Sequence, residues 1–191
     1  MPRVFALLLF GCLLLAFPAV AGAQTSPTGG VQYSDPAPIV APGAKATLLP
    51  DGTAAAPADA PPQVQQAIFA ANKLLDKPYK YGGGHAKVED TGYDCSGTVS
   101  YALLAAGLIK SPLDSSSFMR WGLQGKGAWI TVFSNPGHAY AVIAGLRLDT
   151  SAYGVSSRIA RRIARTSERG PRWRPTVRPM RGFVARHPVN F

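Results

Sequence analysis

The stretch Gly92-Tyr-Asp-Cys-Ser-Gly-Thr-Val-Ser-Tyr-Ala-Leu-Leu-Ala-Ala-Gly107 decides how the rest of the chain is interpreted. Asp94 is a residue type that caps a helix, because its carboxylate accepts hydrogen bonds from the N–H groups that the first turn leaves free. Apolar residues then recur at three- and four-residue spacing, which predicts a helix with one buried face: Val99, Ala102, Leu103 and Ala106. Gly107 suits a left-handed C-terminal cap.

Cys95 falls on the first turn of this predicted helix. There the helix dipole and the free N–H groups favour a negative charge, which lowers the pKa of a thiol. We therefore expect Cys95 to be a nucleophile.

Length and composition allow one domain with extensions, because the chain has 191 residues of which 47% are hydrophobic. Residues 1–23 have the pattern of a secretory signal peptide, with Arg3 before an apolar run and small residues at Ala21-Gly22-Ala23. An uncleaved membrane anchor or a lipid anchor at Cys12 fits this pattern less well. The mature protein is thus expected to be secreted or periplasmic.

The cysteine count changes once the signal peptide is removed. Of the two cysteines, Cys12 is lost and Cys95 becomes the only thiol, so an internal disulfide is excluded. Such a cysteine is intermolecular, buried and inert, or reactive, and its place at a helix start favours the reactive state. One cysteine and three scattered histidines lack the spacing of metal ligands. Neither a metal nor a cofactor is expected.

The formal net charge is +10, and its distribution is uneven: ten of the 20 Lys and Arg residues lie from Arg158 onward, all of them arginine. These arginines either form a solvated face or attract a polyanion, such as an anionic wall polymer or lipid head groups. The densest cluster consists of Arg158, Arg161, Arg162 and Arg165. No RNA- or DNA-binding motif accompanies it, so nucleic acid is not an expected partner.

The domain organisation follows from a change in composition. Residues 24–62 are rich in Pro, Ala, Gly and Thr without periodicity, which predicts a disordered tether. Residues 63–191 are predicted to form the folded domain, which includes the arginine-rich C-terminal part. Its first helix is expected to enter at Pro61-Pro62 and to end before Pro78. Its buried positions at helical spacing are Val64, Ala67, Ile68, Ala71, Leu74 and Leu75.

The next segment, Lys77-Pro-Tyr-Lys-Tyr-Gly-Gly-Gly84, cannot be helical, and its glycines allow close backbone approach. We expect it to form a wall of the site. Tyr79 and Tyr81 alternate and face the same side if the segment is extended, either packing under the loop or presenting hydroxyl groups. His85 is predicted to lie in an exposed loop.

After a short predicted helix that contains Phe118, Met119, Trp121 and Leu123, the chain has the pattern of strands. Residues 128–133, 138–144 and 146–151 predict an antiparallel meander, with turns at 134–137 and at Gly145. Residues 170–175 are expected to form a turn and residues 181–188 a last strand. Helices followed by an antiparallel sheet define an α+β domain.

His138 begins the second of these strands, and Asp149 lies near the end of the third. A tight turn at Gly145 would bring the two side chains together across the ladder. A histidine by itself is more often structural. With Cys95 as nucleophile and Asp149 to orient the imidazole, however, the pattern predicts a complete catalytic triad.

These motifs resemble those of the NlpC/P60 family of cell-wall cysteine peptidases. The matching elements are Pro78-Tyr-Lys-Tyr-Gly-Gly83, Asp94-Cys-Ser-Gly97 at a helix start, and Gly137-His138 at a strand start. The resemblance implies a papain-like fold with N-terminal helices packed on the sheet. It also implies Cys95 as nucleophile and His138 as general base and acid. The residues expected at the oxyanion or substrate site are Tyr79, Tyr81, Gly83 and Ser96.

Two positions depart from the family pattern. The third polar residue is often a histidine, whereas this chain has Asp149 with Thr150 adjacent, and either could fill that place. A Gly-Asp-Leu strand normally precedes the histidine, whereas Trp129-Ile-Thr-Val-Phe133 stands here.

The expected function is that of an exported cysteine peptidase that hydrolyses peptidoglycan stem peptides through a thioester, for example between D-glutamate and a diamino acid. Two alternatives remain open from the sequence. One is a catalytically weak module that binds wall polymer, and the other is a different extracellular thiol amidase or acyltransferase.

Overall fold

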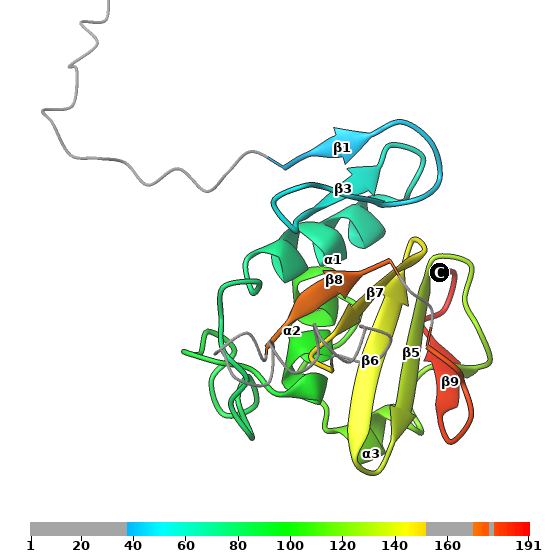
Figure 1. Ribbon diagram of the computed structural model, residues 1–191. Helices are drawn as coiled ribbons and strands as arrows, with labels where there is room; N and C mark the ends of the chain where they lie inside the picture. Colours follow the sequence, from blue (N-terminus) through cyan, green and yellow to red (C-terminus); the bar gives the residue numbers. More distant parts are fainter. Residues whose placement is uncertain (1–37, 152–169, 176–177) are drawn as a thin grey trace, which may run out of the picture. The chain divides into compact units, whose positions relative to one another are not determined.

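The computed structural model describes residues 38–151, 170–175 and 178–191, which belong to one compact unit of the chain. Among the described residues, short strands come first, helices follow, and strands make up the remainder (Figure 1). In chain order the elements are β1 (Val40–Ala41), β2 (Thr47–Leu48), β3 (Ala54–Pro57), α1 (Pro62–Asn72), α2 (Cys95–Ala105), α3 (Ser115–Phe118), β4 (Leu123–Gln124), β5 (Ile130–Asn135), β6 (His138–Ile143), β7 (Leu146–Asp149), β8 (Arg172–Arg174) and β9 (Val184–His187).

The larger sheet has six strands in the order β4-β9-β5-β6-β7-β8, and every neighbouring pair is antiparallel. The predicted meander is confirmed as β5, β6 and β7, and the predicted last strand is confirmed as β9. The prediction of a turn over residues 170–175 is wrong in part, because Arg172–Arg174 pair with β7 as an edge strand. Trp173 holds this strand in place, since its indole N–H donates to the Asn72 side chain at the end of α1 (2.8 Å).

The β6–β7 turn sets the register that the site depends on. Ile143 pairs with Leu146, so the loop has two residues, and both have positive φ: 47° at Ala144 and 93° at Gly145. Positive φ at both loop residues is the geometry of a type I′ turn, whose twist matches that of the flanking strands. With this register, His138 and Asp149 lie near each other at the open end of the hairpin.

Helices α1 and α2 pack against each other and against the strands β6 and β7 (Figure 1). The apolar face predicted for residues 99–106 is confirmed, since all four of its residues are buried in the main core. The strands contribute side chains of one alternation to the same core: Ile130, Val132, Ala139, Ala141, Ile143 and Leu148. The residues of the opposite alternation therefore point to the other face of the sheet.

That second face is also buried, but its composition is different. Phe133 and Tyr140 stack with ring centroids 4.9 Å apart, and Phe183 lies edge-on to Tyr140. Arg147 and Asp149, both charged, are 1% exposed. A charged pair at this depth requires compensation by neighbouring groups, and these two residues belong to the site described below.

The N-terminal part corrects one prediction. Residues 38–62 are not a disordered tether: β1, β3 and β2 form a small sheet, with β3 parallel to β1 and antiparallel to β2. Ala54 and Ala56 are fully buried, and the Asn72 side chain bonds both the N–H and the C=O of Ala54 at 2.9 Å. Small alanines allow β3 to approach α1 closely, which a search for large apolar residues cannot detect.

Other predictions fall on residues outside the described ranges. These are the signal peptide at 1–23, the first part of the tether at 24–37, and the cluster of Arg158, Arg161, Arg162 and Arg165. Among the described residues, no helix is long and apolar enough to cross a membrane. The described elements confirm a mixed α+β class with a largely antiparallel sheet.

Candidate active site

Cys95 is the first residue of α2, as predicted. Asp94 has an extended backbone and caps the helix: its Oδ1 accepts from the Gly97 N–H at 2.7 Å, and its carbonyl accepts from the Thr98 N–H at 3.0 Å. Because this cap is fixed, the thiol is held at the positive end of the helix dipole.

The loop that precedes α2 is bonded to the same cap. Tyr79 forms a parallel bridge with Tyr93, and the Asp94 N–H donates to the Gly83 carbonyl at 3.3 Å. The Gly82 N–H donates to the other carboxylate oxygen of Asp94 at 3.1 Å. The loop predicted to form a wall of the site is therefore held against the start of the cysteine helix.

Two glycines make this contact close enough. A Cβ on Gly97 would lie 2.0 Å from the Gly83 carbonyl oxygen, and a Cβ on Gly83 would lie 2.2 Å from the Gly92 carbonyl oxygen. Both distances are far below van der Waals contact, and the opposing atoms are backbone. Gly83 thus positions the loop through backbone packing, and its own N–H is already bonded to the Lys80 carbonyl at 2.9 Å.

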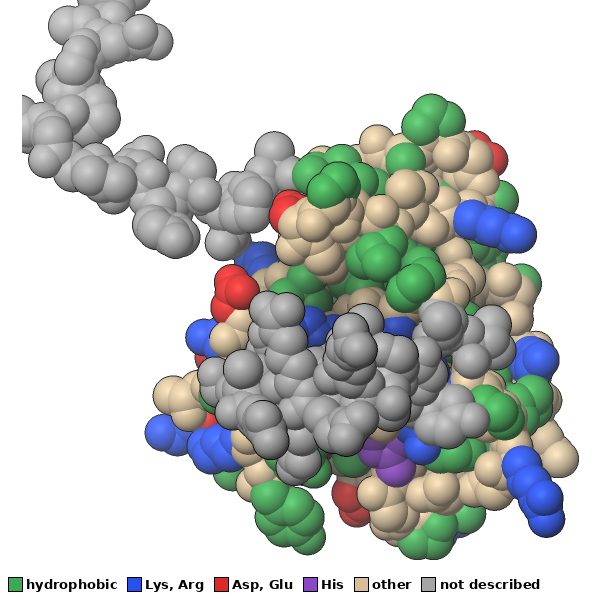
Figure 2. All heavy atoms as spheres, in the orientation of Figure 1, with side chains coloured by type: hydrophobic (Ala, Val, Ile, Leu, Met, Phe, Trp, Pro, Cys, Tyr) green, Lys and Arg blue, Asp and Glu red, His purple; other side chains and the backbone are tan. Residues whose placement is uncertain are grey.

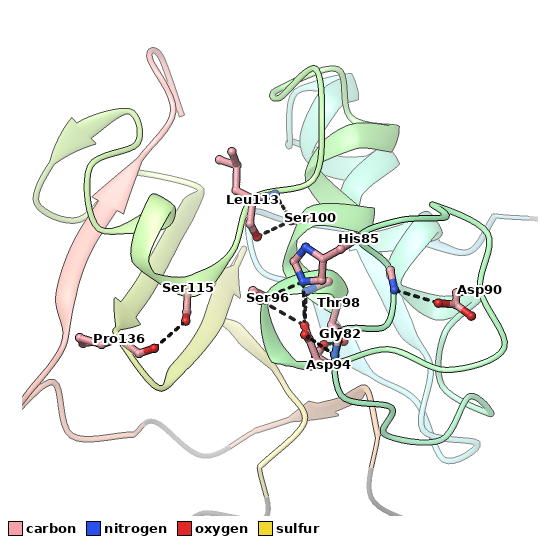
Figure 3. A network of polar contacts seen from close by, with 12 residues as sticks. Gly82, His85, Asp90, Asp94, Ser96, Thr98, Ser100, Leu113, Ser115 and Pro136 are labelled. Carbon is pink, nitrogen blue, oxygen red and sulfur yellow. Dashed lines mark hydrogen bonds and ion pairs between the residues drawn. The ribbon is translucent and has the colours of Figure 1, made fainter.

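His85 corrects a second prediction in part: residues 86–89, which follow it, are exposed as expected, but the His85 side chain itself is half-buried. Figure 3 shows its ring beside Ser96 and Asp94: Nε2 lies 3.2 Å from the Ser96 hydroxyl and 3.1 Å from Asp94 Oδ1. The Ser96 hydroxyl donates to the same Asp94 oxygen at 3.1 Å and is buried. We therefore place the Ser96 side chain in the cap network and not among the groups that face a substrate.

The Cys95 thiol meets the start of β6. Burial by itself raises the pKa of this thiol. Hydrogen bonds from the His138 imidazole and the Ala139 N–H outweigh burial, so the pKa of the thiol lies below its ordinary value. The described residues contain this one free cysteine, and it is 9% exposed. The site thus favours a thiolate inside a largely closed environment.

His138 contacts Asp149 as the hairpin register predicted: His138 Nε2 lies 2.9 Å from Asp149 Oδ1. Since Nε2 faces the carboxylate, Nδ1 is the ring nitrogen that serves the thiol. Burial lowers the pKa of His138, but the hydrogen bonds with Asp149 and Cys95 outweigh burial and raise it to about 9. A lowered thiol pKa beside a raised imidazole pKa describes a thiolate–imidazolium pair.

Asp149 is surrounded by donors on both carboxylate oxygens. Oδ1, which faces His138, also accepts from the Ser151 N–H at 2.8 Å. Oδ2 lies 3.5 Å from Arg147 Nε and 3.4 Å from Arg178 Nη1. Between Asp149 and Thr150, the structure brings Asp149 to the imidazole.

The two tyrosines differ. Burial, followed by the charges of Cys95 and Asp94, raises the pKa of the Tyr79 hydroxyl, which shows that Tyr79 lies within electrostatic reach of the thiol. Tyr79 is 41% exposed and therefore accessible to a substrate. Tyr81 is 92% exposed, so it does not pack under the loop.

Sequence reasoning missed three residues near the site: His85, Arg147 and Arg178. For Arg147 a signal existed, because residues 147 and 149 alternate to the same face of one strand. Arg178 follows a gap in the described chain and packs over the rings of Tyr140 (5.5 Å) and Phe183 (5.0 Å), which no local pattern indicates. For His85, no local sequence pattern indicated its contact with Ser96, which lies eleven residues later in the chain.

Two further features bear on this site: side chains that could bind a metal ion, and the distribution of charge on the surface. The described ranges hold no group of three or more His, Cys, Asp or Glu side chains that could bind a metal ion. Figure 2 shows Lys and Arg side chains spread over the visible face rather than gathered in one patch. Binding of an anionic surface through the arginines at 158–165 stays a prediction.

Comparison with known proteins finds similarity among solved structures. No protein-family model matches the chain, and no curated protein matches it. A solved structure of the peptidoglycan hydrolase RipB from Mycobacterium tuberculosis aligns over 68% of this chain with 18% identity and a TM-score of 0.47. The alignment spans 66% of that structure, slightly less than two thirds of its length. A likeness at this level does not define the function of this chain.

Proposed function

We propose that this protein is a cysteine peptidase of the NlpC/P60 type that hydrolyses peptidoglycan stem peptides. The single observation that supports the reaction class best is the contact chain from Cys95 through His138 to Asp149, with the thiol pKa lowered and the imidazole pKa raised to about 9. The papain-like assignment is part of the same proposal, and its support is a cysteine helix beside an antiparallel sheet that carries the histidine.

In the first step the Cys95 thiolate attacks the scissile carbonyl carbon, and a C–S bond forms while the carbonyl electrons move to oxygen. The Gly97 and Thr98 N–H groups are already bonded to Asp94, so the earlier N–H groups of the first turn of α2 would stabilise the oxyanion. The Tyr79 hydroxyl lies within electrostatic reach of the thiol. It is the side chain that we propose as a further hydrogen-bond donor to the oxyanion.

The tetrahedral intermediate then collapses to a thioester as the C–N bond breaks. The His138 imidazolium gives its proton to the leaving amine, and the resulting neutral imidazole takes a proton from water in the second step. Water attacks the thioester, the C–S bond breaks, and the new carboxylate leaves. Asp149 stabilises the imidazolium and fixes the ring so that Nδ1 faces the sulfur.

The substrate class rests on different support from the reaction class. The elements Pro78–Gly83 and Asp94–Gly97 resemble those of enzymes that cut stem peptides, commonly between D-glutamate and a diamino acid. We propose that bond for this chain. We further propose export by the signal peptide at residues 1–23, and contact with an anionic wall or membrane surface through Arg158 and its neighbours.

The direct test is a digest of purified stem peptides, with products identified by mass spectrometry. Wild-type protein is expected to release fragments cut after D-glutamate, and Cys95→Ala to release none. The matched control is Ser116→Ala on α3, which removes an exposed hydroxyl that belongs to no part of the proposed site and should keep most of the activity. Equal fragment release by wild type and Cys95→Ala would overturn the proposal. Cleavage at another bond would correct the specificity alone.

A further inference from the structure

The third member of the proposed triad is held by two cations that catalysis as described above does not use. Asp149 Oδ1 is engaged by His138 and by the Ser151 N–H, whereas Oδ2 faces Arg147 at 3.5 Å and Arg178 at 3.4 Å. Each carboxylate oxygen therefore has its own set of partners. A rotation of the carboxylate away from His138 would break contacts on both oxygens at once.

Arg147 is placed for this task by the strand itself. It lies two residues before Asp149 on β7, so both side chains emerge on the same face of the sheet. Both are almost completely buried, at 1% exposure. In Figure 1, β7 lies between β6, which carries His138, and the edge strand β8. A guanidinium group at this depth is strongly disfavoured without a carboxylate partner, so the geometry ties Arg147 to Asp149.

The neighbouring strand β8 carries another arginine, which allows the contact of Arg147 to be compared with that of a nearby cation. Arg174 is the cross-strand partner of Arg147 on β8. Two like charges directly opposite each other are destabilising. Of the two, Arg147 is the one that forms an ion pair with Asp149; within the described residues, Arg174 forms none with it. Arg174 is thus a cation in the same region that lacks the contact, which makes it a matched control.

We propose that Arg147, assisted by Arg178, is a positioning residue that holds the Asp149 carboxylate in the orientation that presents Oδ1 to His138. Both arginines contact Asp149 Oδ2, and we assign their effect to that contact. Their effect passes through Asp149 to the orientation and charge of the imidazole. This inference rests on the proposed function for its relevance to turnover, but the contact it describes can be tested without a substrate.

Loss of the Asp149 position and loss of a nearby positive charge have opposite effects on the pKa of His138. The groups that face this imidazole are Cys95 from α2, Asp149 from β7, Tyr140 from its own strand and Phe183 next to Arg178. Removing a nearby cation without moving Asp149 would raise the pKa of His138, because a positive neighbour disfavours the imidazolium. Releasing the Asp149 carboxylate would instead lower that pKa toward 6.5, because the hydrogen bond that raises it would weaken.

The experiment is an NMR titration of the His138 ring in wild type, Arg147→Met and Arg174→Met. The chain has three histidines, so the resonance is assigned by its loss in His138→Ala. Arg147→Met is expected to lower the pKa of His138 by about 1 unit or more and to reduce kcat roughly tenfold with little change in KM. Arg174→Met removes the same charge and is expected to leave the pKa unchanged or slightly raised.

A rise or no change in the His138 pKa of Arg147→Met would overturn the inference. So would a fall of equal size in Arg174→Met, because it would assign the effect to charge or to general loosening. Arg178→Met is the second variant, needed in case Arg147→Met does not fold. The Arg178 side chain is more accessible, and its replacement should shift the pKa in the same direction.

The outcomes also separate this inference from the proposed function. If wild-type protein cuts no stem peptide but Arg147→Met lowers the pKa of His138, the positioning stands and the substrate assignment fails. If the wild-type imidazole titrates near 6.5, no held carboxylate exists and the positioning fails, whatever the protein cleaves.

Discussion

At the scale of single residues, the chemistry of the site depends on opposing effects at His138. Burial disfavours the imidazolium, yet the Asp149 and Cys95 contacts prevail and bring the pKa to about 9. The group is therefore protonated at neutral pH, when the thiolate needs a counter-ion and the leaving amine needs a proton. Asp149 favours the protonated imidazole, and Asp149 in turn forms an ion pair with Arg147 on the buried second face of the sheet.

Asp149→Asn is predicted to reduce both activity and stability. Activity falls because the amide no longer stabilises the imidazolium. Stability falls for two reasons: Arg147 loses its buried carboxylate at every pH, at a cost of about 3 kcal/mol or more, and His138 loses the partner that raised its pKa. The structure thus adds a stability cost that sequence reasoning, which expected mainly an activity cost, did not include.

The second of these losses depends on pH, with a definite sign. The folded pKa of about 9 exceeds the ordinary 6.5, so the stabilisation is fully present below about 6.5 and is lost as the pH rises through 9. The difference in unfolding free energy between wild type and Asp149→Asn should therefore be larger at pH 6 than at pH 10.5. Urea unfolding at both values measures it, and a difference that grows with pH would contradict this account.

Residue-level prediction from sequence succeeded where a short motif states the chemistry. Asp94 as the cap, Cys95 on the first turn, and contact between His138 and Asp149 all agree with the structure. It failed where a partner comes from a distant segment, as Arg178 does. It also failed for Ser96, because a hydroxyl beside a cysteine reads as a site group, while its bonds to Asp94 and His85 are visible only in three dimensions.

At the scale of elements, the β6–β7 hairpin brings His138 and Asp149 into contact although they are eleven residues apart in the sequence. Its two-residue turn sets which residues of the two strands face each other. A one-residue slip would move Asp149 to the opposite face of the sheet and away from His138. The conformation of Ala144 and Gly145 is thus as important for the site as any polar residue.

Gly145→Ala is predicted to destabilise the protein by about 1 kcal/mol, because φ of 93° is unfavourable for a residue with a Cβ. Space is not the cause, since the nearest atom to the added Cβ lies 4.0 Å away. The matched control is Gly137→Ala in the β5–β6 turn, where φ is not in the left-handed region and the nearest atom lies 3.8 Å away. Equal changes in thermal unfolding for the two variants would contradict the turn assignment.

Elements with strong periodicity or turn residues were predictable. Helices α1 and α2 follow from apolar spacing, and β5, β6 and β7 follow from β-rich runs between turns. Strands β1, β2, β3 and β8 were not predictable, because they are two to four residues long and take their order from neighbours. In β3 the residues are three alanines and a proline, whose burial reflects close approach to α1.

At the scale of the whole molecule, segments far apart in sequence complete one structure around the site. The last strand, β9, inserts between β4 and β5, and β8 is joined to α1 through Trp173 and Asn72. The order of strands in the sheet could not be predicted, because it depends on such long-range pairings. The small N-terminal sheet belongs to the same unit, since Ala54 and Ala56 enter the main core.

This organisation predicts where the chain can be shortened. The reference is protein that begins at residue 38, the first described residue. Protein that begins at residue 63 should lose about 2 kcal/mol or more, because Asn72 loses both bonds to Ala54 and the core loses its alanines. The sequence-based boundary at residue 63 predicts the opposite, namely equal stability of the two proteins.

The central claim is that Cys95 and His138 form a thiolate–imidazolium pair, and thiol alkylation against pH tests it most directly. Wild-type protein is expected to react with a small alkylating reagent well below the ordinary thiol pKa of about 8.5. In His138→Ala the buried thiol should titrate at or above that value, because burial then raises its pKa without the imidazole to offset it. A wild-type thiol that titrates near 8.5 and does not change in His138→Ala would contradict the account.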